Sequence, residues 1–338
     1  MLIFIYIFVS EQYIYTATMH FTLPKEGGLV ESKVPQFLLH SYENIPAEIF
    51  SSPERASSEI ADIICDAVTT AAAEGRTFRL GLSTGRTPRI LYHMLSQRCG
   101  EGLVSFKNVE ITTIDEYYPF DKNDIQSRNH IIHTELLDHI DILPENVHIP
   151  DSGIDESSIA EYCDSFDNMA RGLDLLVIGI GERGQVGFNE SGVSLQSRTR
   201  TVLLPYASRK RQAKNFNGEM AHTPNMAVTM GISTMMTARK VILMAFGEDK
   251  AAAVKAASEY SATANCPASY FQGHEDARIF IDDNAASLLT RIEAPWLIGS
   301  CKWTVKFKRK AVVWLCQKVG KPILVYKFYP SANERQRL

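Results

Sequence analysis

Four segments of the sequence carry residue types that can bind phosphate or move a proton, and the first is Gly81-Leu82-Ser83-Thr84-Gly85-Arg86-Thr87-Pro88. Its glycines let the backbone approach an anion, and its hydroxyls donate hydrogen bonds. Thr87 and Pro88 are typical of the N-cap and first residue of a helix, whose positive end favours phosphate. The segment therefore predicts a phosphate-binding loop, with a purely structural turn as the alternative.

The second segment, Asp115-Glu116-Tyr117, closes an apolar run that is typical of a strand. A carboxylate at the end of a strand, beside an aromatic ring and partly desolvated, can serve as a general base. Asp115 is therefore a candidate base. A helix cap is the alternative for the same residue.

The third segment is Gly179-Ile180-Gly181-Glu182-Arg183-Gly184-Gln185-Val186-Gly187-Phe188-Asn189-Glu190. Its four glycines predict a loop held close to a ligand or to another strand's backbone, and Asn189 and Glu190 place polar groups at its far end. The loop lacks the complete dinucleotide-binding fingerprint, so a nucleotide is not predicted.

The fourth segment is discontinuous and supplies cations: its two stretches, Ser208-Arg209 and Gly247-Glu248-Asp249-Lys250, each follow a further apolar run. Either Arg209 or Lys250 could clamp a phosphate from the side opposite the first loop, the arginine bidentately and the lysine as a point charge. Taken singly, each would more often be an ordinary surface charge.

The elements that would position these segments alternate between helix-like and strand-like stretches from Ser51 onward. Ser51 and Glu54 form a capping box ahead of a helix predicted to end at Gly75. Apolar runs predict at least five parallel strands, at residues 78–82, 109–114, 173–180, 241–246 and 277–281. We therefore expect a Rossmann-like, three-layer α/β/α fold with a mostly parallel sheet. Ligands bind beyond the carboxyl ends of such strands, where the four segments lie.

The composition excludes several classes of protein. With 45% hydrophobic and 22% charged residues, the 338-residue chain can bury a large core, and its net charge of −4 offers no broad basic field for nucleic acid. The apolar run at residues 2–9 is too short to span a bilayer and lacks the basic residues and cleavage site of a signal peptide, so no membrane association is predicted. Six scattered cysteines indicate reduced thiols and a cytoplasmic protein.

The chain is predicted to have three regions. Residues 1–38 are an N-terminal extension, with Met19 a candidate initiator, and residues 39–290 are the main α/β domain. Residues 291–338 are a C-terminal appendage with tryptophans, many Lys and Arg side chains and a helix that begins near Thr304. We read those basic residues as a solvated helix face, while residues 327–338 carry no recognisable pattern.

The ordered motifs over residues 40–300 resemble the glucosamine-6-phosphate deaminase/isomerase family. They are GLSTGRTP, IDEYYP, SRNHIIHTELLDHIDI, ENVHIP, GIGERGQVGFNESG, SLQSRTR, NMAVTMGISTMMTARKVILMAFGEDKA and RIEAPWLIG. The terminal segment resembles a longer subgroup in which a deacetylase-like domain follows the isomerase domain; that domain is absent from this chain. The resemblance implies a homo-oligomeric isomerase and hydrolase of amino sugar metabolism, acting in N-acetylglucosamine catabolism without metal or organic cofactor.

The resemblance also implies roles for individual residues. The reaction converts glucosamine 6-phosphate to fructose 6-phosphate and ammonia, and Asp115 matches the base that moves a proton between C2 and C1. The phosphate site is matched by Ser83, Thr84, Gly85, Arg86, Thr87, Arg209 and Lys250. Gly181, Gly184 and Asn189 match the loop that lies against the substrate.

The glycine-rich loop departs from the family pattern, which reads roughly G-x-D-G-H-I-A-F-N-E-P. The Asp, His and Glu of that pattern assist ring opening, and here they are Arg183, Gln185 and Glu190. Glutamine has no proton to exchange near neutral pH, so slowed ring opening is predicted. Arg183 near Glu190 would favour the ionised carboxylate.

Two other functions stay open at this point. A non-catalytic sugar-phosphate sensor would keep the phosphate loop, Arg209 and Lys250 while losing the chemistry at Arg183 and Gln185. A 6-phosphogluconolactonase would share the fold and the loop, but that family also relies on a histidine where Gln185 stands.

Overall fold

The computed structural model describes residues 5–9, 13–17 and 42–320. The chain divides into two compact units, His40–Glu293 and a second unit made of Met1–Leu39 with Ala294–Leu338. The predictions about Met19 and about residues 327–338 lie outside the described residues.

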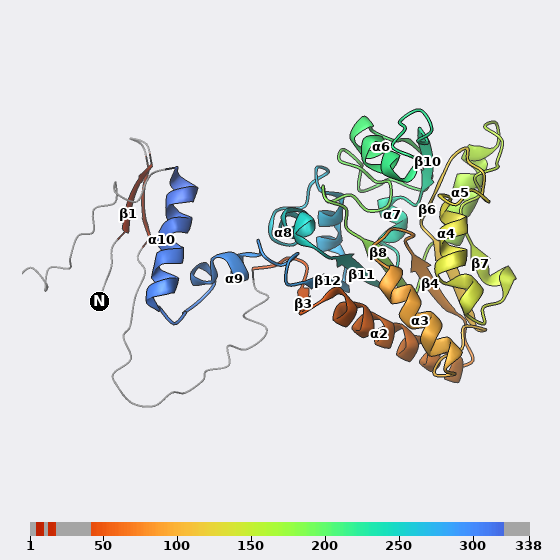
Figure 1. The fold of residues 1–338 in the computed structure, drawn as a ribbon, viewed down its shortest axis with the longest axis horizontal. Helices are drawn as coiled ribbons and strands as arrows, with labels where there is room; N and C mark the ends of the chain where they lie inside the picture. Colours follow the sequence, from red (N-terminus) through yellow and green to blue (C-terminus); the bar gives the residue numbers. More distant parts are fainter. Residues whose placement is uncertain (1–4, 10–12, 18–41, 321–338) are drawn as a thin grey trace, which may run out of the picture. The chain divides into compact units, whose positions relative to one another are not determined.

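A seven-stranded parallel sheet forms the centre of the larger unit (Figure 1). In spatial order its strands are β3 (Ala47–Phe50), β12 (Ala277–Asp282), β11 (Lys240–Ala245), β8 (Leu175–Gly179), β4 (Phe78–Leu82), β5 (Val109–Thr113) and β7 (Val147–His148). The predicted α/β fold is confirmed, and the five predicted apolar runs are β4, β5, β8, β11 and β12.

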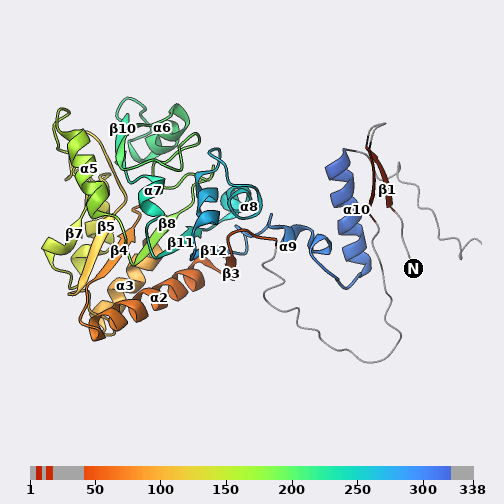
Figure 2. The same cartoon turned by 180° about the vertical axis from the view of Figure 1, so that it is seen from behind.

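Helices cover both faces of this sheet, which gives the three predicted layers (Figures 1 and 2). One face carries α2 (Pro53–Ala73), α3 (Arg89–Gly100) and α4 (Arg128–Glu135). The other carries α5 (Ile159–Met169), α7 (Ile232–Met235) and α8 (Ala251–Glu259). Leu175 and Val177 of β8 pack on the first face and Leu176 and Ile178 on the second, as expected for a strand buried on both sides.

Shorter helices lie in the connections. They are α6 (Tyr206–Gln212), α9 (Thr290–Glu293) and the 3-10 helices η1 (Leu137–His139), η2 (Pro144–Asn146), η3 (Ala213–Asn215), η4 (Glu248–Lys250), η5 (Pro267–Gly273) and η6 (Pro295–Leu297).

Both predicted helix caps are wrong by one residue. The cap of α2 is Ser52, whose hydroxyl accepts a hydrogen bond from the backbone of Arg55 at 3.3 Å, because Pro53 takes the first helical position. Helix α3 begins at Arg89, and its cap residue Pro88 has helical backbone angles and no side-chain hydrogen bond to offer. Thr87 is therefore not an N-cap.

Asp115-Glu116-Tyr117 is not the end of the second predicted strand. Strand β5 of the main sheet ends at Thr113, and Asp115–Tyr117 forms a separate strand, β6. It pairs antiparallel with β10 (Met226–Thr229), which pairs in turn with β9 (Arg200–Leu203). Ile114 links the two sheets, since its backbone N–H donates to the carbonyl of Leu82 at 3.1 Å and its carbonyl accepts from the backbone of Met230 at 2.7 Å. The single apolar run at residues 109–114 does not predict that the chain passes from one sheet to another at its end.

The smaller unit contains an antiparallel pair, β1 (Ile5–Val9) and β2 (Tyr13–Ala17), and the helix α10 (Val305–Val319). The predicted start of α10 is confirmed, since the hydroxyl of Thr304 accepts a hydrogen bond from the backbone of Phe307 at 3.2 Å. Aromatic rings pack together beside it, namely Trp296, Trp303, Phe307 and Trp314. Within the described part of the chain, no helix combines the length and apolarity needed to cross a membrane.

Candidate active site

A cleft of about 620 Å³ opens beyond the carboxyl ends of β4, β8 and β11, with β6 at its side. It brings together most of the residues predicted from the sequence. Those that line it are Ser83, Thr84, Gly85, Arg86, Thr87, Asp115, Gly181, Gln185, Glu190 and Lys250. Segments up to 167 residues apart in the chain thus meet at one edge of the sheet, as parallel topology requires.

The remaining predicted residues do not line this cleft. Arg209 donates to the backbone carbonyls of Met220 at 3.0 Å and Thr223 at 3.4 Å, and so braces a loop. Asn189 is fully buried and holds backbone carbonyls of its own loop and of Met230. Gly184 packs against Cys266, and Arg183 does not line the cleft itself but contacts Glu190 and Ser208, which do.

Asp115 is the buried carboxylate of the cleft, only 6% exposed. Burial is the main cause that raises its pKa, to about 6, and the neighbouring charge of Glu116 raises it further. The positive charge of Arg128 and a 3.4 Å hydrogen bond from the hydroxyl of Thr84 act in the opposite direction. A carboxylate with a pKa near 6 is a stronger base than an ordinary aspartate and is still largely ionised at neutral pH.

Gly187 is the residue of the glycine-rich loop that lies against Asp115. A Cβ atom on Gly187 would lie 3.1 Å from Asp115 Oδ2 and 3.1 Å from Thr229 Oγ1, and its φ of +56° favours glycine. A side chain at this position would press on the carboxylate of Asp115, so glycine allows the loop its close approach.

Glu116 anchors the segment that holds Asp115. Its carboxylate is fully buried and accepts hydrogen bonds from the hydroxyl of Ser127 at 2.7 Å and from the backbone of Arg128 and Asn129 at 3.0 and 2.8 Å. These partners form the N-terminus of α4, where a carboxylate is favoured. Glu116 thus ties β6 to α4 and has a structural task, which the sequence analysis did not assign.

The loop between β4 and α3 is tied to the start of the glycine-rich loop. The hydroxyl of Ser83 accepts a hydrogen bond from the backbone of Gly179 at 3.3 Å, and the hydroxyl of Tyr92 on α3 donates to the carbonyl of Ser83. The first turn of α3 follows directly, so the hydroxyl-bearing loop and the N-terminus of α3 line the cleft together, as an anion site requires.

Glu190 takes part in a polar network at the side of the cleft. Its carboxylate pairs with Arg183 at 2.8 Å and accepts a hydrogen bond from the hydroxyl of Ser208. Arg183 also donates to Ser208 at 2.8 Å, and Arg211 donates to the same hydroxyl at 3.3 Å. The network links the glycine-rich loop to α6.

Gln185 folds back onto its own loop. Its side-chain carbonyl accepts a hydrogen bond from the backbone of Arg183 at 3.0 Å, and a Cβ atom on Gly181 would lie 2.1 Å from its amide carbon. The amide fills the space above Gly181 and holds the loop's shape, but it supplies no group that titrates near neutral pH.

Three cations that line the cleft were missed by the sequence analysis: Arg128, Arg211 and Lys214. Arg211 and Lys214 belong to the same basic stretch as Arg209, so the sequence did signal cations after β9. Which of these cations face the cleft depends on how α6 is rotated about its axis and on the position of η3 (Ala213–Asn215). The sequence alone predicts neither. Lys250 lines the cleft as predicted and pairs with Asp249 at 3.6 Å.

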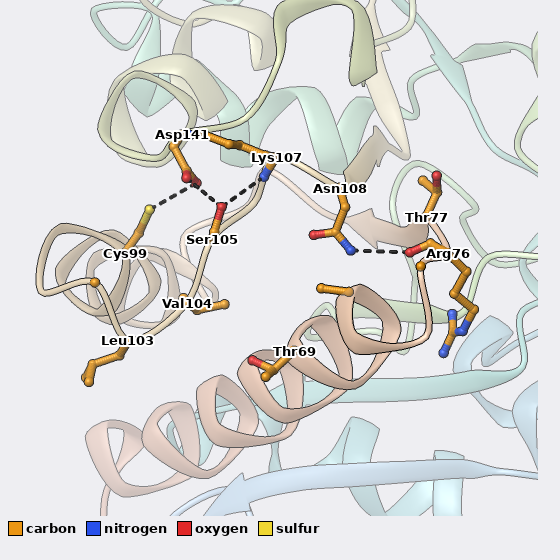
Figure 3. Close-up of a pocket in the computed structure, with 13 residues that line it drawn as sticks. Thr69, Arg76, Thr77, Cys99, Leu103, Val104, Ser105, Lys107, Asn108 and Asp141 are labelled. Atoms are coloured by element: carbon orange, nitrogen blue, oxygen red, sulfur yellow. Dashed lines mark hydrogen bonds between the residues drawn. The ribbon is translucent and has the colours of Figure 1, made fainter.

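A second pocket of about 680 Å³ lies at the opposite edge of the sheet, near the amino ends of β4 and β5 (Figure 3). Its polar groups are engaged with one another: Asp141 accepts hydrogen bonds from Ser105 at 2.6 Å and from the thiol of Cys99 at 3.3 Å, and Asn108 donates to the carbonyl of Arg76. None of the predicted site residues lies there. Among the described residues, no group of three or more His, Cys, Asp or Glu side chains could hold a metal ion.

Known proteins resemble this chain over the same region. Residues 51–280 match the family model described as glucosamine-6-phosphate isomerases/6-phosphogluconolactonase. A putative glucosamine-6-phosphate deaminase-like protein of Bacteroides thetaiotaomicron is 40% identical over 297 residues, which are 87% of this chain and 45% of that protein. The chain thus spans less than half of that relative. A glucosamine-6-phosphate deaminase of Hahella chejuensis is 41% identical over 214 residues, covering 63% of this chain and 82% of that protein.

Solved structures agree with these matches. A monomeric glucosamine-6-phosphate deaminase has a TM-score of 0.67 and 31% identity, and the match covers 72% of this chain and all of that one. A 6-phosphogluconolactonase from Trypanosoma cruzi, with a TM-score of 0.60 and 16% identity over 73% of this chain and 97% of its own, shares the fold alone. The family-model match, residues 51–280, lies within the unit that contains the cleft. The chain belongs to the glucosamine-6-phosphate isomerase/6-phosphogluconolactonase family.

Proposed function

We propose that this chain converts glucosamine 6-phosphate to fructose 6-phosphate and ammonia. The observation that carries the proposal is the burial of Asp115 in a cleft whose facing loop, Ser83–Thr87, presents hydroxyls and the start of α3. A base with a pKa near 6 and a phosphate-binding loop in one cleft suit proton transfer on a sugar phosphate. The deaminases among its relatives support the same reaction.

The chemistry needs one group that takes a proton and returns it to the neighbouring carbon. Asp115 takes the proton from C2 of the open-chain aldehyde; the electrons of that C–H bond form the C1–C2 double bond, and the aldehyde oxygen takes up a proton. Asp115 then returns its proton to C1, which leaves a C=N bond at C2. Water hydrolyses this bond to the ketone of fructose 6-phosphate and ammonia.

The phosphate would be held by the Ser83–Thr87 loop together with cations of the cleft. Arg211, Lys214 and Lys250 line it, and binding the remote phosphate would orient the reacting carbons beside Asp115. Arg86 lines the cleft as well. The steps described above use neither a metal nor an organic cofactor.

Ring opening is the step for which this site is least equipped. Gln185 stands where a titrating side chain would exchange protons with the ring, and Glu190 is engaged by Arg183 and Ser208. General acid and base help is typically worth roughly 10²- to 10⁴-fold, so we propose turnover limited by ring opening.

The test is ammonia release from glucosamine 6-phosphate by the purified protein and three variants. Asp115→Asn should abolish release, Gln185→His should accelerate it, and Asp66→Asn, which changes an exposed carboxylate on α2, should leave it unchanged. Release that survives Asp115→Asn would contradict the assignment of the base.

Two features also favour a second candidate function, a sugar-phosphate sensor without turnover. Glu190 is paired with Arg183, and the amide of Gln185 cannot exchange a proton. Calorimetry would then find binding of glucosamine 6-phosphate by every variant while no ammonia forms. Hydrolysis of 6-phosphogluconolactone, measured in parallel, would instead support the lactonase alternative.

We further propose a cytoplasmic homo-oligomer acting in N-acetylglucosamine catabolism. The cysteines of the described residues are all free thiols, which suits a reducing compartment. Leu203 at the end of β9 and Tyr206 at the start of α6 are 76% and 68% exposed, and we propose that they supply apolar surface to a contact between subunits. Light scattering of the protein and of a Leu203→Glu variant would test the oligomer, and a monomeric mass for the unchanged protein would exclude it.

A further inference from the structure

Arg128 occupies the first turn of α4, where a positive charge is disfavoured. Backbone N–H groups at a helix N-terminus favour Asp or Glu side chains and repel cations. Here the buried carboxylate of Glu116 satisfies that end of the helix by accepting from the backbone of Arg128 and Asn129. A side chain that breaks a local preference in an otherwise consistent element points to a functional role.

Aromatic rings hold the guanidinium of Arg128 in one place. Its central carbon lies 4.9 Å from the ring centre of Tyr117 and 5.5 Å from that of Phe188, and its Nη2 donates to the hydroxyl of Tyr117 at 3.3 Å. Its Nε atom is buried and makes no hydrogen bond. The side chain lines the cleft together with Asp115.

Asp115 is surrounded by groups from several elements. The titratable ones that interact with it are Glu116 and Tyr117 on β6, Tyr92 on α3 and Arg128 on α4, and the hydroxyl of Thr84 adds a hydrogen bond. Arg128 supplies the positive charge within this set. Because a carboxylate must be ionised to take a proton from carbon, burial and Glu116 oppose the active state while Arg128 favours it.

We propose that Arg128 is a positioning residue that keeps Asp115 ionised and ready to accept a proton from the substrate. The kinetic test below rests on the proposed function; the titration that follows it does not. Arg128 acts through Asp115, so its loss should change the pH at which the enzyme works rather than the rate reached when Asp115 is fully ionised.

The kinetic test compares kcat/KM between pH 5 and 9 for the full chain, Arg128→Lys and Arg128→Met. In Arg128→Met the acid limb should move to higher pH by about one to two units, while the plateau above it stays within about threefold of the original. Arg128→Lys, which keeps the charge, should restore most of the shift. Arg239→Met removes an exposed arginine that pairs with Asp174 at the other edge of the sheet, and it should leave the limb in place.

A uniform loss of rate at every pH, with the limb unmoved, would overturn the proposal and leave Arg128 with a packing role. Should Arg128→Met fail to fold, Arg128→Gln provides the same loss of charge with a side chain that keeps hydrogen-bonding groups. Circular dichroism of each variant establishes that the fold is retained.

A titration without substrate separates this inference from the proposed function. Carbon-13 NMR of aspartate-labelled protein follows the carboxyl of Asp115, assigned by its disappearance in Asp115→Asn. If the midpoint rises in Arg128→Met, the role of Arg128 stands even where no ammonia is released. If the midpoint does not move, the role is excluded even in an active deaminase.

Discussion

The guanidinium of Arg183 lies 2.8 Å from the carboxylate of Glu190, and both groups bind the hydroxyl of Ser208. Arg183 is 44% exposed, so it can be removed without opening the core. Because Arg183 and Ser208 occupy the carboxylate of Glu190, Arg183→Met should free one of its oxygens for the substrate and raise the rate of ammonia release by about tenfold. Stopped-flow or coupled assays with glucosamine 6-phosphate measure this directly. A fall in kcat would show instead that Arg183 holds Glu190 in its productive position.

The pH dependence of the unchanged protein follows from Asp115. Its pKa is raised to about 6, chiefly by burial, and the base is active only when ionised. The rate should therefore be highest above this value and fall tenfold per unit as the pH drops through about 6 and below. A profile of kcat/KM from pH 4 to 8 measures the midpoint. A midpoint near 4, the ordinary range of an aspartate, would mean that Asp115 is not buried in this way while the enzyme turns over.

Arg209 and Arg211 offer a matched pair for locating the phosphate. Arg211 lines the cleft, whereas Arg209 donates to the carbonyls of Met220 and Thr223. Arg211→Ala should raise KM roughly tenfold or more with little change in melting temperature, since it removes a charge that binds the substrate.

Arg209→Ala should do the reverse. It leaves the carbonyl of Thr223 without its side-chain donor, while the carbonyl of Met220 keeps a hydrogen bond from the backbone of Thr223 at 3.3 Å. The loss should cost about 1 to 3 kcal/mol and lower the melting temperature while KM stays close to its original value. Thermal unfolding and steady-state kinetics on the two variants decide between them. A large KM effect for Arg209→Ala would support the prediction from the sequence that Arg209 binds the phosphate.

Gly187→Ala tests the close approach of the glycine-rich loop to Asp115. The new Cβ atom would lie 3.1 Å from Asp115 Oδ2, at a residue whose φ is +56°. The strain should cost about 1 to 3 kcal/mol, or a few degrees in melting temperature for a unit of this size, and the displaced carboxylate should lose most of its activity.

The control is Gly102→Ala, which has a φ of +73° and open space around the position of its Cβ atom. It should show the backbone cost without the loss of activity. Equal activity in the two variants would mean that Asp115 adapts to the intrusion.

Much of the fold could be predicted because its signals are local. Apolar runs buried on both faces become β4, β5, β8, β11 and β12, and the cleft forms beyond the carboxyl ends of β4, β8 and β11. The caps at Ser52 and Pro88 were misplaced by one residue because a proline can stand at, or just after, a cap. Residues 115–117 were assigned to the preceding strand because only pairing with β10, more than a hundred residues away, moves them to a second sheet.

The sequence by itself determined the α/β class, the order of the loops and the residue types that meet in the cleft, since hydrophobic periodicity and glycine-rich turns are properties of short segments. Only the tertiary structure decided that Arg211 rather than Arg209 lines the cleft, that Gly187 lies against Asp115 and that Arg128 shares the cleft with this base. These facts depend on how one turn of a helix is rotated and on contacts between segments distant in the chain. The sequence states which side chains carry a charge, but tertiary packing determines where those side chains point and how deeply they are buried.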